Sequence, residues 1–202
     1  MNILIVSGSQ RENSQSAKVA QYLMQQLQPN QHVKHIELCQ YQLPFWDGES
    51  GSKSSEGSRW PLISQQIKRA DALILITPEW GGMASPIMKN FLLMCDSQQT
   101  AHKPALLVSV VSGINGAYPI AELRMNAFKN NKLVATPDHL IIRNVDAVLN
   151  HAQPVDERDC QLREFIGYCL HMLAQYAEAL TVIRAKHHTR PYPKQHEYSY
   201  GM

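Results

Sequence analysis

The chain has 202 residues and a formal net charge of +2, with 44% hydrophobic and 18% charged residues. This length fits one domain, and the composition excludes a disordered chain or a collagen-like repeat. The near balance of 19 basic and 17 acidic side chains gives no case for a nucleic-acid partner. The four cysteines form no CxxC pair, which argues against a zinc site. The apolar run at the start is far too short for a signal peptide or a membrane span, so we expect a cytoplasmic protein with no membrane partner.

Short apolar runs alternate with helical patterns along the chain. The run over residues 3–6 has no polar alternation, which is typical of a parallel strand covered on both faces. In residues 16–27 the apolar positions recur at steps of three and four, which indicates a helix with one buried face. The same criteria predict further strands over residues 33–38, 72–76 and 105–111, and a fifth strand in two pieces, 133–134 and 140–142. They predict further helices over residues 61–70, 86–95, 121–128 and 156–185.

This alternation predicts one α/β domain over residues 1–185 with a parallel sheet. Residues 186–202 form a basic, aromatic tail, which the sequence leaves open as an interface segment or a disordered end. Residues 47–58 are polar and rich in Gly and Ser, so we expect a mobile loop there. Ligands bind beyond the carboxyl ends of parallel strands, so the site should lie in the loops that follow the first, third and fourth strands.

The loop over residues 7–16 has the composition of a phosphate cradle. It follows a strand and opens a helix, where backbone N–H groups and the helix dipole favour an anion. Ser9, Ser14 and Ser16 add hydroxyl donors, and Arg11 adds a planar positive charge. The loop lacks GxGxxG, a GK[ST] ending and a cysteine, so we expect a phosphate monoester bound without a metal. The alternative is that Ser14 or Ser16 only caps the helix.

The loop over residues 77–86 should form another wall of the same site. Pro78, Gly81 and Gly82 indicate an irregular backbone that neither continues a strand nor begins a regular helix. Trp80 offers an aromatic wall for a flat ligand, although plain packing explains that side chain equally well. The loop therefore favours a planar ligand beside the phosphate cradle.

Three motifs together resemble the NADPH-dependent FMN reductase family. They are GSxRxxS after the first strand, TPE-aromatic-x-x-x-x-x-P-x-x-K-N after the third, and a Ser/Gly loop at residues 111–116 followed by Leu123-Arg124. Each motif is weak alone, but their order and spacing over residues 1–144 are specific. The resemblance implies a flavodoxin-like three-layer α/β sandwich, with helices on both faces of a five-stranded parallel sheet in the order 2-1-3-4-5.

The resemblance also implies an FMN-dependent enzyme with NAD(P)H as co-substrate. Such an enzyme passes hydride through flavin N5 to a small electrophile, such as a quinone or free flavin, with no catalytic side chain and no metal. The residues that match the family's FMN site are Ser9, Arg11, Ser14, Gln15 and Ser16 for the phosphate; Pro78, Glu79, Trp80 and Gly81 for the flavin ring; and Ser112, Gly113 and Gly116 for its other side. For Glu79 we expect a turn contact or an ion pair, with Lys89 or Arg124 as partner.

One departure from the family pattern keeps two other functions open. The family commonly has Tyr-Asn where this chain has Trp80-Gly81, which removes one polar contact to the flavin. The first alternative is a flavodoxin-like electron carrier, which the net charge of +2 disfavours because such carriers are strongly acidic. The second is an FMN-binding sensor or interaction protein without turnover.

The helix after the second loop carries many apolar side chains. One buried face does not need all of them: Met83, Ile87, Met88, Phe91, Leu92 and Met94. Because the family is often dimeric or tetrameric, we expect a homo-oligomer with part of this helix at the interface.

Overall fold

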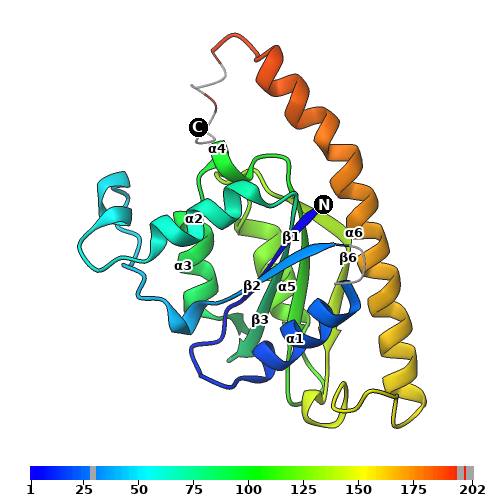
Figure 1. Ribbon diagram of the computed structural model, residues 1–202. Helices are drawn as coiled ribbons and strands as arrows, with labels where there is room; N and C mark the ends of the chain where they lie inside the picture. Colours follow the sequence, from blue (N-terminus) through cyan, green and yellow to red (C-terminus); the bar gives the residue numbers. More distant parts are fainter. Residues whose placement is uncertain (28–30, 195–197, 199–202) are drawn as a thin grey trace.

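A computed structural model describes residues 1–27, 31–194 and 198 of the chain. Its centre is a sheet of five parallel strands in the order β2-β1-β3-β5-β6 (Figure 1). The strands are β1 (Asn2–Ser7), β2 (His32–Glu37), β3 (Ala72–Trp80), β5 (Pro104–Val110) and β6 (Val134–Ile142). This is the flavodoxin-like winding, so the predicted sheet is confirmed. The labels differ from 2-1-3-4-5 because a two-residue strand, β4 (Met83–Ala84), pairs antiparallel with β3 outside the parallel order.

Helices cover both faces of the sheet and make the three predicted layers (Figure 1). On one face, Ile3 and Ile5 of β1 pack in one core cluster with the buried sides of α1 (Gln15–Leu27) and α6 (Glu157–Thr189). On the other face, the alternate residues Leu4 and Val6 pack with three helices. These are α2 (Trp60–Arg69), α3 (Pro86–Met94) and α5 (Ala117–Asn126). The shorter helices are η1 (Leu38–Gln40), η2 (Ser50–Ser54), α4 (Ser97–Thr100) and η3 (Val145–Ala147).

The prediction that the chain leaves the sheet at Thr77 is wrong. Strand β3 continues to Trp80, and β4 folds back on it, with Glu79 opposite Ala84 and Trp80 opposite Met83. The two residues between the strands, Gly81 and Gly82, have φ values of 57° and 75°. Two successive positive φ values fit the two-residue hairpin turn that matches the twist of the flanking strands. The glycines therefore turn a hairpin rather than end a strand.

Other element boundaries shift by a few residues. Helix α5 begins at Ala117 instead of residue 121, after Gly116, which has a left-handed φ of 99°. Strand β6 is continuous rather than in two pieces, and α6 ends at Thr189, four residues beyond the predicted end. In the segment predicted as a mobile loop, Lys53 is buried and its Nζ lies 2.7 Å from Asp96 Oδ1, so this ion pair anchors the segment. Over the described residues, no helix is long and apolar enough to cross a membrane.

Candidate active site

A cavity of about 530 Å³ lies at the carboxyl edge of the sheet, between the loops after β1 and β5 and the last residues of β3. Ten of the twelve predicted site residues line it: Ser9, Arg11, Ser14, Gln15, Ser16, Pro78, Glu79, Trp80, Ser112 and Gly113. Gly81 and Gly116 do not line it. Other lining residues were not predicted, among them Glu12, Asn13, Val145 and Asp146. Val145 and Asp146 follow β6. Because β6 is parallel to the other strands and ends at the same edge of the sheet, the residues after it could have been predicted to line the cavity.

The amino end of α1 forms one side of this cavity. Ser14 precedes the helix, and its Oγ accepts the backbone N–H of Ala17 at 3.1 Å. Asn13 before it has a φ of 50°, and Ser9 Oγ accepts the N–H of Arg11 at 3.1 Å. Ser14 therefore does cap the helix, as the alternative interpretation proposed. The cap pairs one backbone N–H group, and the other N–H groups of the first helical turn have no partner within the helix.

Ser16 has a different environment from Ser14. Its side chain is 1% exposed, and its Oγ has no hydrogen-bond partner among the described residues. Gln15 next to it donates Nε2 to Asp146 Oδ1 at 2.5 Å, while its Oε1 is buried without a partner. A buried polar group without a partner costs about 1–3 kcal/mol. A hydroxyl donor left unpaired beside a helix amino end is what a phosphate oxygen would satisfy.

The two serines should respond differently to removal of the hydroxyl. We expect Ser14→Ala to lower the free energy of unfolding by about 1 kcal/mol because the cap is lost. We expect Ser16→Ala to leave it unchanged or to raise it, since the substitution removes an unpaired buried hydroxyl and breaks no hydrogen bond in the ligand-free protein. Urea denaturation of the ligand-free protein measures both values. Equal losses for the two variants would contradict the distinction.

The end of β3 supplies the aromatic wall. Trp80 lines the cavity, and the guanidinium carbon of Arg11 lies 5.4 Å from its ring centroid. This distance is within the range of a cation–π contact. The contact joins the phosphate loop to the aromatic wall, so the exposed Arg11 side chain is held beside the cavity.

Glu79 makes the predicted turn contact but not with the predicted partners. Its Oε2 accepts the backbone N–H of Gly116 at 2.7 Å. Lys89 instead lies 3.0 Å from Glu122, and Arg124 donates to the backbone carbonyls of Thr136 and Pro137. Glu79 therefore ties the β3 loop to the start of α5.

Gly116 is positioned for this contact rather than for the ligand. Its φ of 99° is left-handed, and a Cβ there would collide with the Ile141 side chain. Only glycine fits both conditions. Gly116 therefore fixes the loop after β5, whereas Ser112 and Gly113 of the same loop face the cavity.

A buried histidine lies behind the phosphate loop. Ser7 Oγ and His35 Nε2 are 2.8 Å apart. Burial lowers the pKa of His35, against the opposing effect of Glu37, so the imidazole is neutral at pH 7. His35 does not line the cavity, and this pair supports the end of β1 rather than the reacting groups.

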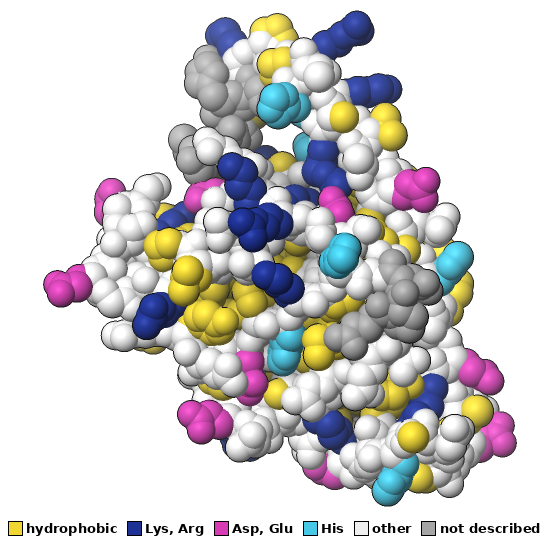
Figure 2. Space-filling view, viewed as in Figure 1, with side chains coloured by type: hydrophobic (Ala, Val, Ile, Leu, Met, Phe, Trp, Pro, Cys, Tyr) yellow, Lys and Arg dark blue, Asp and Glu magenta, His cyan; other side chains and the backbone are white. Residues whose placement is uncertain are grey.

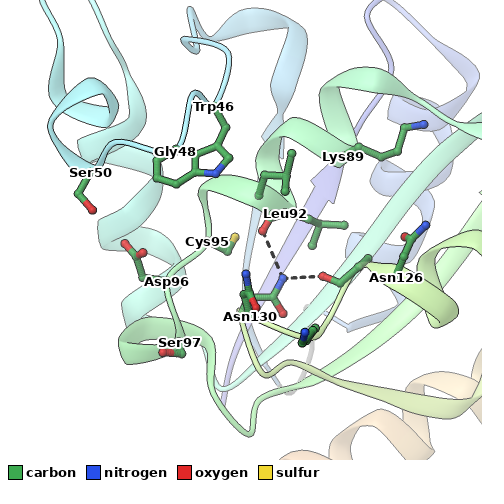
Figure 3. A pocket seen from close by; sticks show the side chains of 14 residues that line it. Trp46, Gly48, Ser50, Lys89, Leu92, Cys95, Asp96, Ser97, Asn126 and Asn130 are labelled. Atoms are coloured by element: carbon green, nitrogen blue, oxygen red, sulfur yellow. Dashed lines mark hydrogen bonds between the residues drawn. The ribbon is translucent and has the colours of Figure 1, made fainter. Parts of the chain in front are cut away.

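A second cavity, of about 490 Å³, lies where α3 and α5 end. Figure 3 shows Trp46, Leu92 and Asn130 around it. The Nζ of Lys53 lies 4.5 Å from the Trp46 ring centroid and is paired with Asp96. The lining offers an indole and several amides but lacks the hydroxyl-rich helix amino end of the first cavity. The first cavity is therefore the one that fits a phosphate monoester.

Comparison with known proteins identifies the family. The family model described as NADPH-dependent FMN reductase matches residues 1–147, which carry all three loops of the site. The chain belongs to the NADPH-dependent FMN reductase family. The resemblance drawn from the three motifs is thereby confirmed, and the match ends before α6 begins.

Two curated relatives are azoreductases. An NADPH azoreductase from Bacillus sp. (strain OY1-2) is 28% identical over 116 residues, which are 57% of this chain and 62% of that protein. The match thus spans about six tenths of that relative's length. An FMN-dependent NADPH-azoreductase from Staphylococcus aureus is 26% identical over 168 residues, or 81% of this chain and 89% of the relative.

A solved structure shares the fold of this FMN reductase family member. It is FerB, a flavoenzyme NAD(P)H:(acceptor) oxidoreductase from Paracoccus denitrificans, with a TM-score of 0.72 and 18% sequence identity. The alignment covers 88% of this chain and 97% of FerB. This coverage includes part of the chain beyond residue 147, so the likeness in fold is wider than the family match.

Proposed function

We propose that the chain is an FMN-dependent NAD(P)H oxidoreductase whose flavin occupies the 530 Å³ cavity. The observation that carries the proposal is the buried Ser16 hydroxyl, which has no partner and lies in the first turn of α1 beside Arg11. A phosphate monoester there would accept from the hydroxyl, from the helix N–H groups and from the guanidinium. Family membership and the names of the relatives make FMN the phosphate monoester that fits best.

The remaining walls suit a flat, apolar ring. Trp80 offers an indole, Pro78 and Gly113 offer backbone close to the cavity, and Val111 adds an apolar surface. A bound flavin would supply the hydride chemistry between NAD(P)H and the acceptor. The chain's own residues bind and orient it: Arg11 neutralises the phosphate charge, and Glu79 holds the β3 loop against Gly116.

FMN binding is the first test of this proposal. We expect the purified protein to retain FMN after the excess is removed, with absorption bands at about 370 and 450 nm. Arg11→Ala should weaken FMN binding at least about tenfold, because a hydrogen bond to a charged group contributes about 1.5–3 kcal/mol. Ser16→Ala should also weaken it, although by less. Arg158→Ala is the matched control, since Arg158 is exposed on α6, outside the cavity.

The binding test has clear negative outcomes. Failure of the unaltered protein to bind FMN at tens of micromolar would reject the flavin assignment. Equal affinity of the Arg11→Ala variant and the parent protein would reject the placement of the phosphate at α1, even if FMN binds.

Turnover separates the oxidoreductase from the two other functions. We expect steady-state oxidation of NADPH or NADH when FMN and an acceptor are present, and we propose azo dyes, quinones and free flavin as acceptors. The azo class is included because two curated relatives are named azoreductases. Nicotinamide oxidation followed at 340 nm measures the rate, with Arg11→Ala as the impaired variant and Arg158→Ala as the control. FMN binding without turnover on any acceptor would favour the carrier or the sensor.

We also propose that the chain forms a homo-oligomer through a surface that keeps Met83 of the predicted residues and otherwise uses other side chains. Of the predicted interface residues of α3, the side chains of Met88, Phe91, Leu92 and Met94 are buried within the chain. The exposed apolar side chains lie beside them: Phe45, Met83, Leu93, Tyr118 and Met125.

Several of these exposed side chains lie on or beside α5. Tyr118 and Met125 are seven residues apart and so share one helical face. A Cβ added at Gly82 would lie 3.9 Å from the Tyr118 ring, which places the β3–β4 turn beside this face. Leu93 lines the second cavity together with Asn126, the neighbour of Met125 (Figure 3). A surface of this kind is typical of a contact between subunits.

The oligomer can be tested with a charged substitution. Met125 is 81% exposed, so Met125→Glu should leave the fold intact and disrupt an apolar interface. We expect the unaltered protein to have a dimeric or tetrameric mass by light scattering and the variant to shift toward the monomer. Val182→Glu on α6, across the sheet from α5, is the control and should keep the parent mass. A monomeric mass for the unaltered protein at tens of micromolar would end this proposal.

A further inference from the structure

A third cavity, of about 420 Å³, lies at the amino edge of the sheet, away from the flavin cavity. It is enclosed by the end of α2, by α4, by the start of β5 and by the last turns of α6. Lys103 of its lining precedes β5, whereas Ser112 of the flavin cavity follows that strand. Seven strand residues at about 3.3 Å each separate the two by roughly 23 Å. The two cavities are therefore separate sites.

Basic side chains dominate the lining of this cavity. They are Lys68, His102, Lys103, Arg184, His187 and His188. Among the described lining residues, Asp71 carries the sole carboxylate. Figure 2 shows Lys and Arg side chains gathered on this side of the molecule, between α2 and α4 and the upper half of α6. Apart from the histidines, two lysines and one arginine face one aspartate.

Specific hydrogen bonds fix side chains that line this cavity. Lys103 is 6% exposed, and its Nζ donates to the carbonyls of Ile67 at 2.7 Å and Lys68 at 3.0 Å. Two of its three ammonium donors are thus used. Burial, with a smaller contribution from the charge of Arg184, lowers the pKa of Lys103 to about 8.

Arg184 joins α6 to the rest of the lining. Its Nη1 donates to the carbonyl of His102 at 3.1 Å, and its Nη2 donates to Thr181 Oγ1 at 2.8 Å. Asp71 Oδ1 lies 3.8 Å from Arg184 Nη2. The rings of His102 and His187 stack with their centroids 4.7 Å apart. Burial lowers the pKa of His102, with further contributions from His187, Arg184 and Lys132. The lining therefore concentrates cations that repel one another, an arrangement that a bound anion would stabilise.

We propose that this cavity binds a small, multiply charged anion of the phosphate class, such as a di- or triphosphate group. The fork of Arg184 and the ammonium groups of Lys68 and Lys103 provide charged donors from three elements around one space. The histidines on α6 and before β5 add N–H donors. Three of the lining residues come from α6, which lies outside the residues matched by the family model, and the other lining residues lie within that match.

The test is calorimetric titration of the whole purified chain with inorganic triphosphate at pH 7 and low ionic strength. Lys68→Ala removes an exposed lysine of the lining, and Arg184→Ala removes the residue that joins α6 to it. Arg158→Ala is the matched control, because it removes one exposed positive charge from the other end of the same helix. Arg11→Ala reports on the phosphate cradle of the flavin cavity. Thermal melts verify that each variant is folded.

We expect micromolar binding of triphosphate that Lys68→Ala and Arg184→Ala each weaken at least about tenfold. Arg158→Ala should bind as the parent does, and triphosphate that enters the flavin cavity as well is identified by its loss in Arg11→Ala. If Arg184→Ala does not fold, the Lys68→Ala variant decides the result.

Three outcomes would overturn the proposal. The first is no heat of binding at millimolar triphosphate. The second is a loss of binding in Arg11→Ala with none in Lys68→Ala, which would place the anion in the flavin cavity. The third is an equal loss in Arg158→Ala and Lys68→Ala, which would show attraction to net charge without a site.

Discussion

The parallel, in-register pairing of β1, β3 and β5 is the constraint on which the site depends. β1 ends at Ser7, which is paired with Ile76, and β5 ends at Val110, which is paired with Pro78, while β3 continues between them to Trp80. Neighbouring strands lie about 4.8 Å apart. Hydrogen bonds also join their loops, since Gly8 N–H donates to Ile76 O at 2.8 Å and Ser85 Oγ donates to Gly8 O. Because both faces of these strands are buried, a one-residue slip would place each side chain on the wrong face. Register therefore fixes the cavity.

The same double burial explains why the core was predictable from sequence. Strands covered on both faces are continuous apolar runs, so residues 72–76 and 105–111 stood out without any tertiary information. The phosphate loop was predictable too, because a helix amino end and its hydroxyls are local features. The extension of β3 to Trp80 was not, because it depends on pairing with β4 as well as on local propensity. The Lys89–Glu122 pair joins residues 33 positions apart, and no local pattern marks such a contact.

The hairpin also explains how the chain can depart from the family pattern at Trp80-Gly81. Gly81 is at a positive φ of 57° and lies outside the cavity lining. Asparagine is among the residues that adopt this conformation most readily, so Asn and Gly are both compatible with the same turn. The exchange thus preserves the backbone that presents Trp80. What it changes is the side chain at the turn, while the aromatic wall and its contact with Arg11 stay in place.

Helices have their amino ends at one edge of the sheet and their carboxyl ends at the other, so the helix ends at the two edges favour opposite charges. At the carboxyl edge the amino end of α1 favours an anion, and Arg11 adds to that preference. At the amino edge the last turn of α2 favours cations, which accounts for Lys103 on the carbonyls of Ile67 and Lys68. The helix end does not account for Arg184, His187 and His188, which α6 brings to this edge. The basic lining at this edge is therefore assembled from two parts of the chain, the lysines beside the end of α2 and the side chains of the C-terminal helix, on a fold whose sheet already separates the two edges.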